Sequence, residues 1–434
     1  MRFYLILLLL FPYIALSQSK TNKADVLYSK AYSFYENSRH DSAIVYFSQA
    51  AEHYEVYENW KKLSLCLDNI GNSNSWLQQY KEAIDAWNKA KQIKLYKLKT
   101  KDPKEKITDS YIAGAYFFTG FYDEALEYFN KAEQNLLKRY DEHHPDIVAV
   151  YNNIASIYEI KCDYDRSIEY YRRTLKIWRS TLGNEHPNIA SVYFSLGGIY
   201  MAKGQLKEAS EFLHNSLKIR LNSFGERNAN VASCYQKLGE INMLQNEFQL
   251  AEQFYYKNLI IKMIVLGEEN PEVVDANLSL ANVYARQGKH DKSIGFFLKC
   301  LRDLFNLYED ENAIIAHVSF DLANAYYLKG SYEKALKQLN TTLRIYSEIF
   351  GPNHGYTAKA HQLMGDAYMN LNEPEMAYTA YHKTFEILTA NFNATDVYTL
   401  PSLADIRGKL FFEDAQQSLL LALYSKALLL YKNS

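Results

Sequence analysis

Small and large apolar residues follow one another in a fixed order along most of the chain. In the stretch Asn153 to Leu175, NIASIYEIKCDYDRSIEYYRRTL, the small residue Ala155 is followed by aromatic residues three and nine places on and by a turn residue at seven. A second small residue follows at twelve places and a large one at sixteen. Apolar positions spaced this way on both sides of a turn predict two amphipathic helices that pack as a pair.

The same order of residues recurs nine times. Successive first small residues are 40 residues apart once and then 42 residues apart seven times. A period between about 20 and 50 residues indicates stacked supersecondary units, none of which could bury its apolar face alone. The first small residues are Ala31, Gly71, Ala113, Ala155, Gly197, Gly239, Ala281, Ala323 and Gly365.

Two further positions keep their character in every unit. The residue twelve places on is small, so that the two helices can approach, and the residue sixteen places on is large, so that it can fill the space between neighbours. The sequence therefore predicts an all-α solenoid of about nine helix pairs. The small residues are Ala43, Ala83, Ala125, Ser167, Ala209, Ala251, Ser293, Ala335 and Ala377, and the large ones are Phe47, Trp87, Phe129, Tyr171, Leu213, Tyr255, Phe297, Leu339 and Tyr381.

This order of small and aromatic residues resembles the tetratricopeptide repeat, and its 42-residue spacing resembles the kinesin-light-chain-like variety. The linker between units carries the more specific part of the resemblance, as LGNEHP (182–187), LGEENP (266–271) and DEHHP (141–145). The resemblance covers residues 24–390 and implies a right-handed superhelix. Residues 391–434 follow as a connection and amphipathic helices, which we expect to cap the end of the array because an uncapped end exposes apolar surface.

The N-terminal residues predict export. An apolar run from Phe3 to Leu16 follows Arg2 and ends near Ser17, which is the pattern of a secretory signal peptide, here residues 1–17. The alternative is an uncleaved anchor, but about 14 apolar residues interrupted by Pro12 fall short of the roughly 20 that span a membrane. We therefore expect a periplasmic or extracellular chain with no membrane span after removal of the signal.

Composition narrows the classes of partner. A formal net charge of −2 with 23% charged residues gives no bulk field that would favour nucleic acid. Export would permit disulfides, but the four cysteines belong to four non-adjacent units, and their pairing would need Cα atoms within about 7 Å. Free and mostly packed thiols are the prediction for Cys66, Cys162, Cys234 and Cys300.

The sequence contains no common catalytic motif: it has no phosphate-binding loop, no GxSxG, no HExxH and no pair of CxxC. His143 and His144 could suggest a metal pair, but they stand where the linker has its His-Pro, so a structural role is favoured. We expect no enzyme, no cofactor and no metal site. No feature of the sequence fixes the oligomeric state.

The resemblance implies where a partner would bind. In tetratricopeptide arrays the first helices line an inner groove, and the side chains two places before, one after and four after the small residue point into it. Asn side chains there could hydrogen-bond to both the N–H and the C=O of a peptide. Only one of these residues is cationic, so a clamp for a carboxylate is disfavoured. Counting Asn152 as an adjacent place, the predicted groove residues are Asn69, Asn72, Tyr111, Asn152, Asn153, Ser195, Lys237, Ser279, Asn282, Asp321, Asn324 and Tyr327.

Three functions are compatible with this pattern. The first is an exported, non-catalytic scaffold that binds a protein or peptide segment in the groove. The second is the sensing arm of a peptidase system, because FNATDVYTLPSL and the helix after it resemble the junction that precedes caspase-like CHAT domains in bacterial proteins. The third is a spacer, which would bind no partner.

Overall fold

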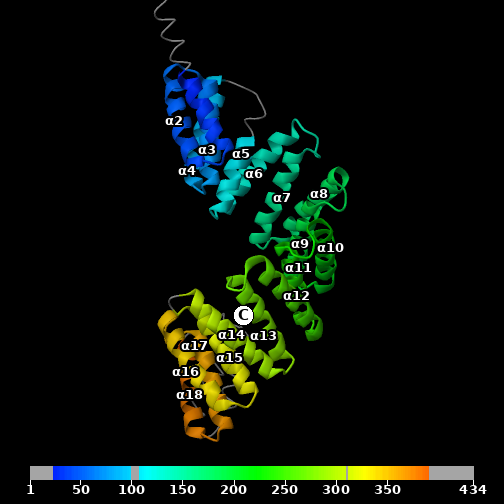
Figure 1. The fold of residues 1–434 in the computed structure, drawn as a ribbon, viewed down its shortest axis with the longest axis vertical. Helices are drawn as coiled ribbons and strands as arrows, with labels where there is room; N and C mark the ends of the chain where they lie inside the picture. The colour runs from blue at the N-terminus through cyan, green and yellow to red at the C-terminus, as the bar shows by residue number, and fades with distance from the viewer. Residues whose placement is uncertain (1–22, 99–106, 309–310, 391–434) are drawn as a thin grey trace, which may run out of the picture. The chain divides into compact units, whose positions relative to one another are not determined.

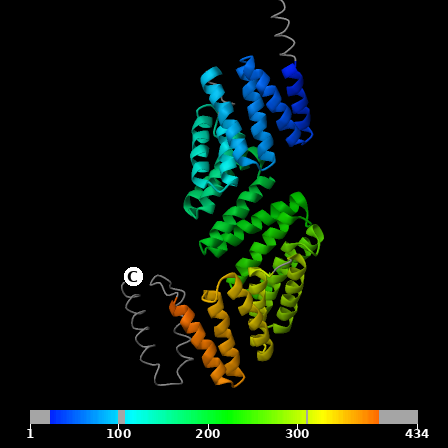
Figure 2. The ribbon, with the colours of Figure 1, turned by 90° about the vertical axis from the view of Figure 1, so that its left-hand side faces the viewer.

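The computed structural model describes residues 23–98, 107–308 and 311–390 (Figure 1). These residues form eighteen α-helices and one five-residue π-helix, and Figure 2 shows the α-helices following one another as antiparallel hairpins. In chain order they are residues 23–36, α2 (His40–Val56), α3 (Trp60–Trp76), α4 (Tyr80–Ile93), the π-helix η1 (Lys94–Leu98), α5 (Ile107–Phe118), α6 (Tyr122–Leu137), α7 (Pro145–Ile160), α8 (Tyr164–Leu182), α9 (Pro187–Ala202), α10 (Leu206–Phe224), α11 (Ala229–Leu244), α12 (Phe248–Leu266), α13 (Pro271–Arg286), α14 (His290–Leu307), α15 (Ala313–Leu328), α16 (Tyr332–Ile349), α17 (Gly355–Asn370) and α18 (Pro374–Ala390).

The contacts divide the chain into two compact units, residues 1–204 and 205–434. The first unit contains the helices up to α9, and the second contains α10 to α18. Within each unit, every helix packs on the one before it and on the one after it. This order of contacts confirms the predicted all-α solenoid of helix pairs.

The predicted packing positions are confirmed. The nine first small residues and the nine small residues twelve places on are all buried. The large residues sixteen places on are buried as well, from Phe47 in α2 to Tyr381 in α18. The core of each unit is therefore a ribbon between two helix layers, built by the same positions in each repeat.

Each helix hairpin closes through one residue in the left-handed conformation. Gly120, Gly204, Gly288 and Gly330 have φ between 71° and 81°. Cys162 holds the same place with φ 57°, and the corresponding residues of three further pairs are Ser38, Gln78 and Asn246. These turns confirm the prediction, and the residues other than glycine and asparagine carry some strain there.

The His-Pro linker has a structural role. His186 precedes α9, and its Nδ1 accepts a hydrogen bond from the backbone N–H of Asn188 at 3.1 Å, while Pro187 occupies the first helical position. Asn270 and Pro271 cap α13 in the same way. The linker motif thus encodes an N-cap and a helix start, which satisfies backbone donors that no helical bond can reach.

The cysteine prediction is confirmed: all four thiols are free, and only Cys162 is exposed. Burial raises the pKa of Cys66 and of Cys300 to about 12. The helix α3 is rich in polar residues and nevertheless forms over Trp60–Trp76. Asn74, which stands where an aromatic was expected, is buried there because its Nδ2 donates to the carbonyl of Ile70 at 3.0 Å.

Several predictions fall outside the described residues. These are the signal peptide (1–17) and the C-terminal connection and cap (391–434). The right-handed superhelix and the domain boundaries stay predictions too. Among the described helices, none is both long enough and apolar enough to span a membrane.

Candidate binding face

The first helices of neighbouring pairs are joined side by side through polar side chains. In the first unit, Asn69 Nδ2 on α3 donates to Tyr28 Oη on the helix of residues 23–36 at 3.2 Å. In the second unit, Asn370 Nδ2 on α17 donates to Tyr327 Oη on α15 at 3.4 Å. We call the surface carried by these helices and lined by the predicted groove positions the first-helix face. It is described separately for each unit.

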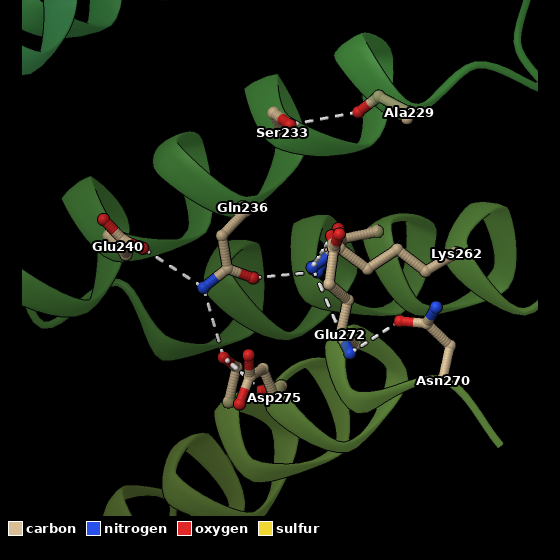
Figure 3. A network of polar contacts seen from close by, with 10 residues as sticks. Ala229, Ser233, Gln236, Glu240, Lys262, Asn270, Glu272 and Asp275 are labelled. Carbon is tan, nitrogen blue, oxygen red and sulfur yellow. Dashed lines mark hydrogen bonds and ion pairs between the residues drawn. The ribbon is translucent and has the colours of Figure 1, made fainter. Parts of the chain in front are cut away.

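Gln236 is the centre of a polar network that joins α11, α12 and α13 (Figure 3). Its Nε2 donates to Glu240 Oε1 at 3.1 Å and to Ser279 Oγ at 3.2 Å. Its Oε1 accepts a hydrogen bond from Nδ2 of the buried Asn258 at 2.8 Å. A single amide therefore uses both of its ends to hold two first helices and one second helix in register.

Two predicted groove residues of the first unit have internal partners. Besides the bond from Asn69 to Tyr28, Trp87 Nε1 donates to Asn72 Oδ1 at 3.2 Å. Tyr111 stacks on Trp87 with ring centroids 5.7 Å apart, although half of Tyr111 is exposed. Both asparagines thus have partners within the array, and about half of Tyr111 remains exposed.

The two adjacent asparagines predicted on α7 differ in their exposure. Asn153 is exposed and Asn152 is half-buried, and neither side chain has a hydrogen bond to another described residue. One turn further on, Tyr171 Oη donates to Glu159 Oε2 at 2.9 Å, and burial raises the pKa of the Glu159 carboxyl. Ser195 on α9 also contributes a hydrogen bond to this carboxylate.

In the second unit, the predicted cation is already neutralised. Lys237 Nζ lies 2.8 Å from Glu240 Oε2 on the same helix, so its charge is not free to bind a carboxylate. Asn282 on α13 is exposed, and its side chain makes no hydrogen bond to any residue that the structure describes. Ser279, as noted above, belongs to the network of Gln236.

Three predicted residues lie on α15. Tyr327 accepts the bond from Asn370 and packs against the ring of Tyr332 at 5.7 Å. Asp321 and Asn324 are half-buried, and in the described part of the chain neither side chain has a hydrogen-bond partner. Burial alone raises the pKa of the Asp321 carboxyl to about 6.

The prediction missed the carboxylates of this face. Glu159, Glu240 and Asp366 lie one or four places after a first small residue, so the spacing rule that selected the asparagines also selects them. Asp366 Oδ1 accepts a hydrogen bond from Tyr381 Oη at 2.7 Å. Together with Asp321 they give the face more carboxylates than cations. Gln236 stands three places before its small residue, outside the three positions of the rule; the prediction included that place only for Asn152.

The histidine pair of the linker has structural partners. His144 Nδ1 accepts a hydrogen bond from the backbone N–H of Asp146 at 3.3 Å, and His143 Nδ1 lies 2.5 Å from Asp141 Oδ1. Within the described ranges, no group of three or more His, Cys, Asp and Glu side chains could hold a metal ion.

A family model described as the tetratricopeptide repeat matches the chain in five segments, of which the first three overlap in sequence and so do the last two: residues 107–180, 146–213, 188–259, 272–348 and 311–390. These segments cover well over half of the 434 residues. No curated protein gives a significant match to the sequence.

Several solved structures resemble the chain at low sequence identity. The apo form of RapI has a TM-score of 0.57 at 16% identity and covers 86% of this chain and 97% of its own. The apo form of the quorum sensor NprR from B. thuringiensis has a TM-score of 0.53 at 16% identity, covering 86% and 98%. A Podosopora anserina protein described as a kinesin light chain has a TM-score of 0.43 at 20% identity, covering 49% and 100%. At these identities the likeness concerns the fold.

Proposed function

Because the chain belongs to the tetratricopeptide-repeat family, we propose that it is a scaffold that binds a segment of a partner protein on its first-helix face. Tetratricopeptide arrays imply protein partners, and the proposal adds the place and the manner of binding. The bound segment would lie extended across several first helices and would bind chiefly through its backbone.

One observation carries this proposal. Asn153, Asn282 and Asn324 lie on first helices with amide groups that no other described residue satisfies, whereas Asn69 and Asn72 at equivalent places are used internally. An amide supplies both a donor and an acceptor, so Asn282 and Asn324 on successive first helices of the second unit can pair with the N–H and C=O groups of an extended backbone, and Asn153 can do the same by itself in the first unit. The fold likeness to a quorum sensor is compatible with a ligand-binding role.

Affinity capture with the tagged chain from an extract of the source organism tests the proposal. Asn153→Arg in the first unit and Asn282→Arg in the second place a long cation on the face at exposed positions. The matched controls are Gln134→Arg on α6 and Gln253→Arg on α12, which add the same charge at exposed positions of second helices.

We expect a partner that is retained by both control variants and lost, or weakened about tenfold or more, with at least one of the two face variants. Retention by all four variants would show that the partner binds elsewhere. Capture of no partner would favour a spacer.

We also propose that the chain is exported. This part of the proposal rests on the sequence of residues 1–17, which lie outside the described residues. The peptidase-arm alternative rests on the resemblance of residues after 390 to the junction before CHAT domains. Recovery of a caspase-like protein in the capture would favour it over a general scaffold.

A further inference from the structure

Asp321 differs from the other carboxylates of the first-helix face because it has no partner among the residues that the structure describes. Glu159 accepts a hydrogen bond from Tyr171, Glu240 pairs with Lys237, and Asp366 accepts from Tyr381. Asp321 on α15 makes no ion pair and accepts no hydrogen bond within residues 311–390 or the earlier described ranges. It is nevertheless half-buried, so it has given up part of its hydration without receiving a donor in return.

The eighth repeat lacks the tyrosine that donates to a first-helix carboxylate in two other repeats. In two other units a tyrosine sixteen places after the small residue donates to the carboxylate of the first helix, as Tyr171 and Tyr381 do. The corresponding residue of the eighth unit is Leu339, which has no donor. Burial and, to a smaller extent, the charge of Asp321 raise the pKa of Tyr346, and the hydroxyl of Tyr346 is hydrogen-bonded to His317 Nδ1 at 2.8 Å.

A half-buried carboxylate without a counter-charge destabilises the folded chain. A cation supplied by a bound partner would remove that penalty and gain a charge-assisted hydrogen bond. The unpaired Asn324 lies one turn further along α15, and the unpaired Asn282 lies on the preceding first helix, α13. The carboxylate of Asp321 and the amides of Asn282 and Asn324 therefore lie on the first helices of two successive repeats, α13 and α15.

We propose that Asp321 binds the side chain of an Arg or Lys residue in an extended partner segment, while Asn282 and Asn324 hydrogen-bond to the backbone of that segment. This proposal rests on the proposed function and adds the chemistry of the partner to it. The complementarity of charge decides the class of partner. A segment rich in acidic residues would meet Asp321, Glu240 and Asp366, and like charges oppose binding.

The titratable groups around Asp321 supply no cation at neutral pH. His317, one turn earlier on α15, has a pKa lowered by burial and by the charges of His354 and Lys359, so it is neutral at pH 7. Tyr346 on α16 has a pKa raised by burial, and Tyr356 on α17 packs its ring on His317 with centroids 4.6 Å apart. None of these three groups supplies a counter-charge to Asp321, so a cation on a bound partner could take that place.

A phage-displayed library of random dodecapeptides, selected on the full chain, provides a probe that does not require the natural partner. The selected peptides are then synthesised and titrated against the wild-type chain and three variants. Asp321→Asn removes the charge and keeps the shape, and Asn282→Arg blocks the face. Asp291→Asn removes the same charge from an exposed position on the second helix α14.

We expect selected peptides that carry at least one Arg or Lys, bind Asp291→Asn like the wild type, and lose about tenfold or more in affinity on Asp321→Asn. Replacement of the peptide's basic residue by Gln should cause a similar loss, and the two losses should not add. Peptides without basic residues, or with equal affinity for Asp321→Asn, would overturn the assignment of Asp321.

The same titrations distinguish this failure from failure of the proposed function. Peptides that lose affinity with Asn282→Arg but not with Asp321→Asn leave the binding face intact and refute only the cation site. If the selection yields no binder, or only binders that Asn282→Arg does not affect, both the binding face and the cation site are refuted for the second compact unit.

The pH dependence of the affinity gives a second readout. Ionisation of Asp321 should strengthen binding of an Arg peptide as the pH rises from 5 to 7, because the carboxylate is the binding form. Asp321→Asn should abolish that rise in affinity. A rise caused by titration of His317 would instead persist in the variant. A rise of equal size in the variant would contradict the proposal.

Discussion

Gly239 on α11 lies directly against the ring of Tyr255 on α12. A Cβ atom at position 239 would fall 2.5 Å from Cε1 of Tyr255, closer than any real carbon contact. Gly71 and Trp87 in the second pair, and Gly365 and Tyr381 in the ninth, have the same relationship. In these pairs the first small residue is glycine because the ring sixteen places on occupies the space of a methyl group.

Gly239→Ala should therefore destabilise the α11–α12 pair. Overpacking a close-packed contact costs about 1 to 3 kcal/mol, of which the better helix propensity of alanine returns up to about 1 kcal/mol. Faster amide hydrogen exchange in α11 and α12 and a lower thermal midpoint should report the loss. Gly295→Ala on α14 is the control, because a Cβ there meets no atom within 4 Å. That control should stabilise the chain slightly, and equal protection in both variants would refute the contact.

The two serines that replace alanine twelve places after the first small residue should behave in opposite ways. Ser167 Oγ donates to the carbonyl of Ala155 at 2.8 Å, whereas the equally buried Ser293 Oγ has no partner among the described residues. Ser167→Ala should cost about 1 kcal/mol, and Ser293→Ala should raise the stability by a similar amount because it removes an unsatisfied hydroxyl. Urea unfolding of the two variants checks the difference in sign, and two losses of equal size would contradict it.

An asparagine should be able to replace His186, because Asn270 holds the same place in the linker before α13. His186→Ala removes the acceptor for the N–H of Asn188 and should cost about 1 kcal/mol, as loss of an N-cap does. His186→Asn should restore most of it, since Asn270 caps α13 with the same geometry. Thermal unfolding measures both variants, and an equal loss in Asn and Ala would mean that the imidazole acts through packing.

The sequence predicts the fold well because its packing rules act over short distances. Each small residue and its large partner lie sixteen places apart in the same hairpin, as Gly239 and Tyr255 do, so the repeat pattern alone pairs them. The left-handed turn at Cys162 follows from its place seven residues after Ala155, although its side chain would not suggest it.

The polar partners of the first-helix face could not be predicted in the same way. Asn69 uses Tyr28, which lies 41 residues earlier, and Gln236 uses Ser279, 43 residues later. These bonds depend on the lateral register of neighbouring first helices, which the repeat period fixes only to within a residue or two. The sequence therefore indicates which asparagines belong to the face and not which of them are free.

The stability of the chain should fall as Asp321 ionises. Its pKa is raised to about 6 in the folded chain from an ordinary 3.8, so the folded state binds more protons than the unfolded state between these values. Stability contributed by the protonated form is present below about pH 4 and is lost as the pH rises through about 6. Asp321→Asn should thus stabilise the chain at pH 7, by about 1 to 3 kcal/mol, and leave it nearly unchanged at pH 4.

Urea unfolding of the wild type and of Asp321→Asn at pH 4, 5.5 and 7 checks this linkage, with Asp291→Asn as the exposed control. The gain should grow with pH in Asp321→Asn alone. A residue that costs stability and has no partner among the described residues is expected where binding requires it, because a bound cation returns what the fold has lost. If the gain of Asp321→Asn over the wild type were no larger at pH 7 than at pH 4, Asp321 would already be well solvated, and the physical reason for a cation site there would be removed.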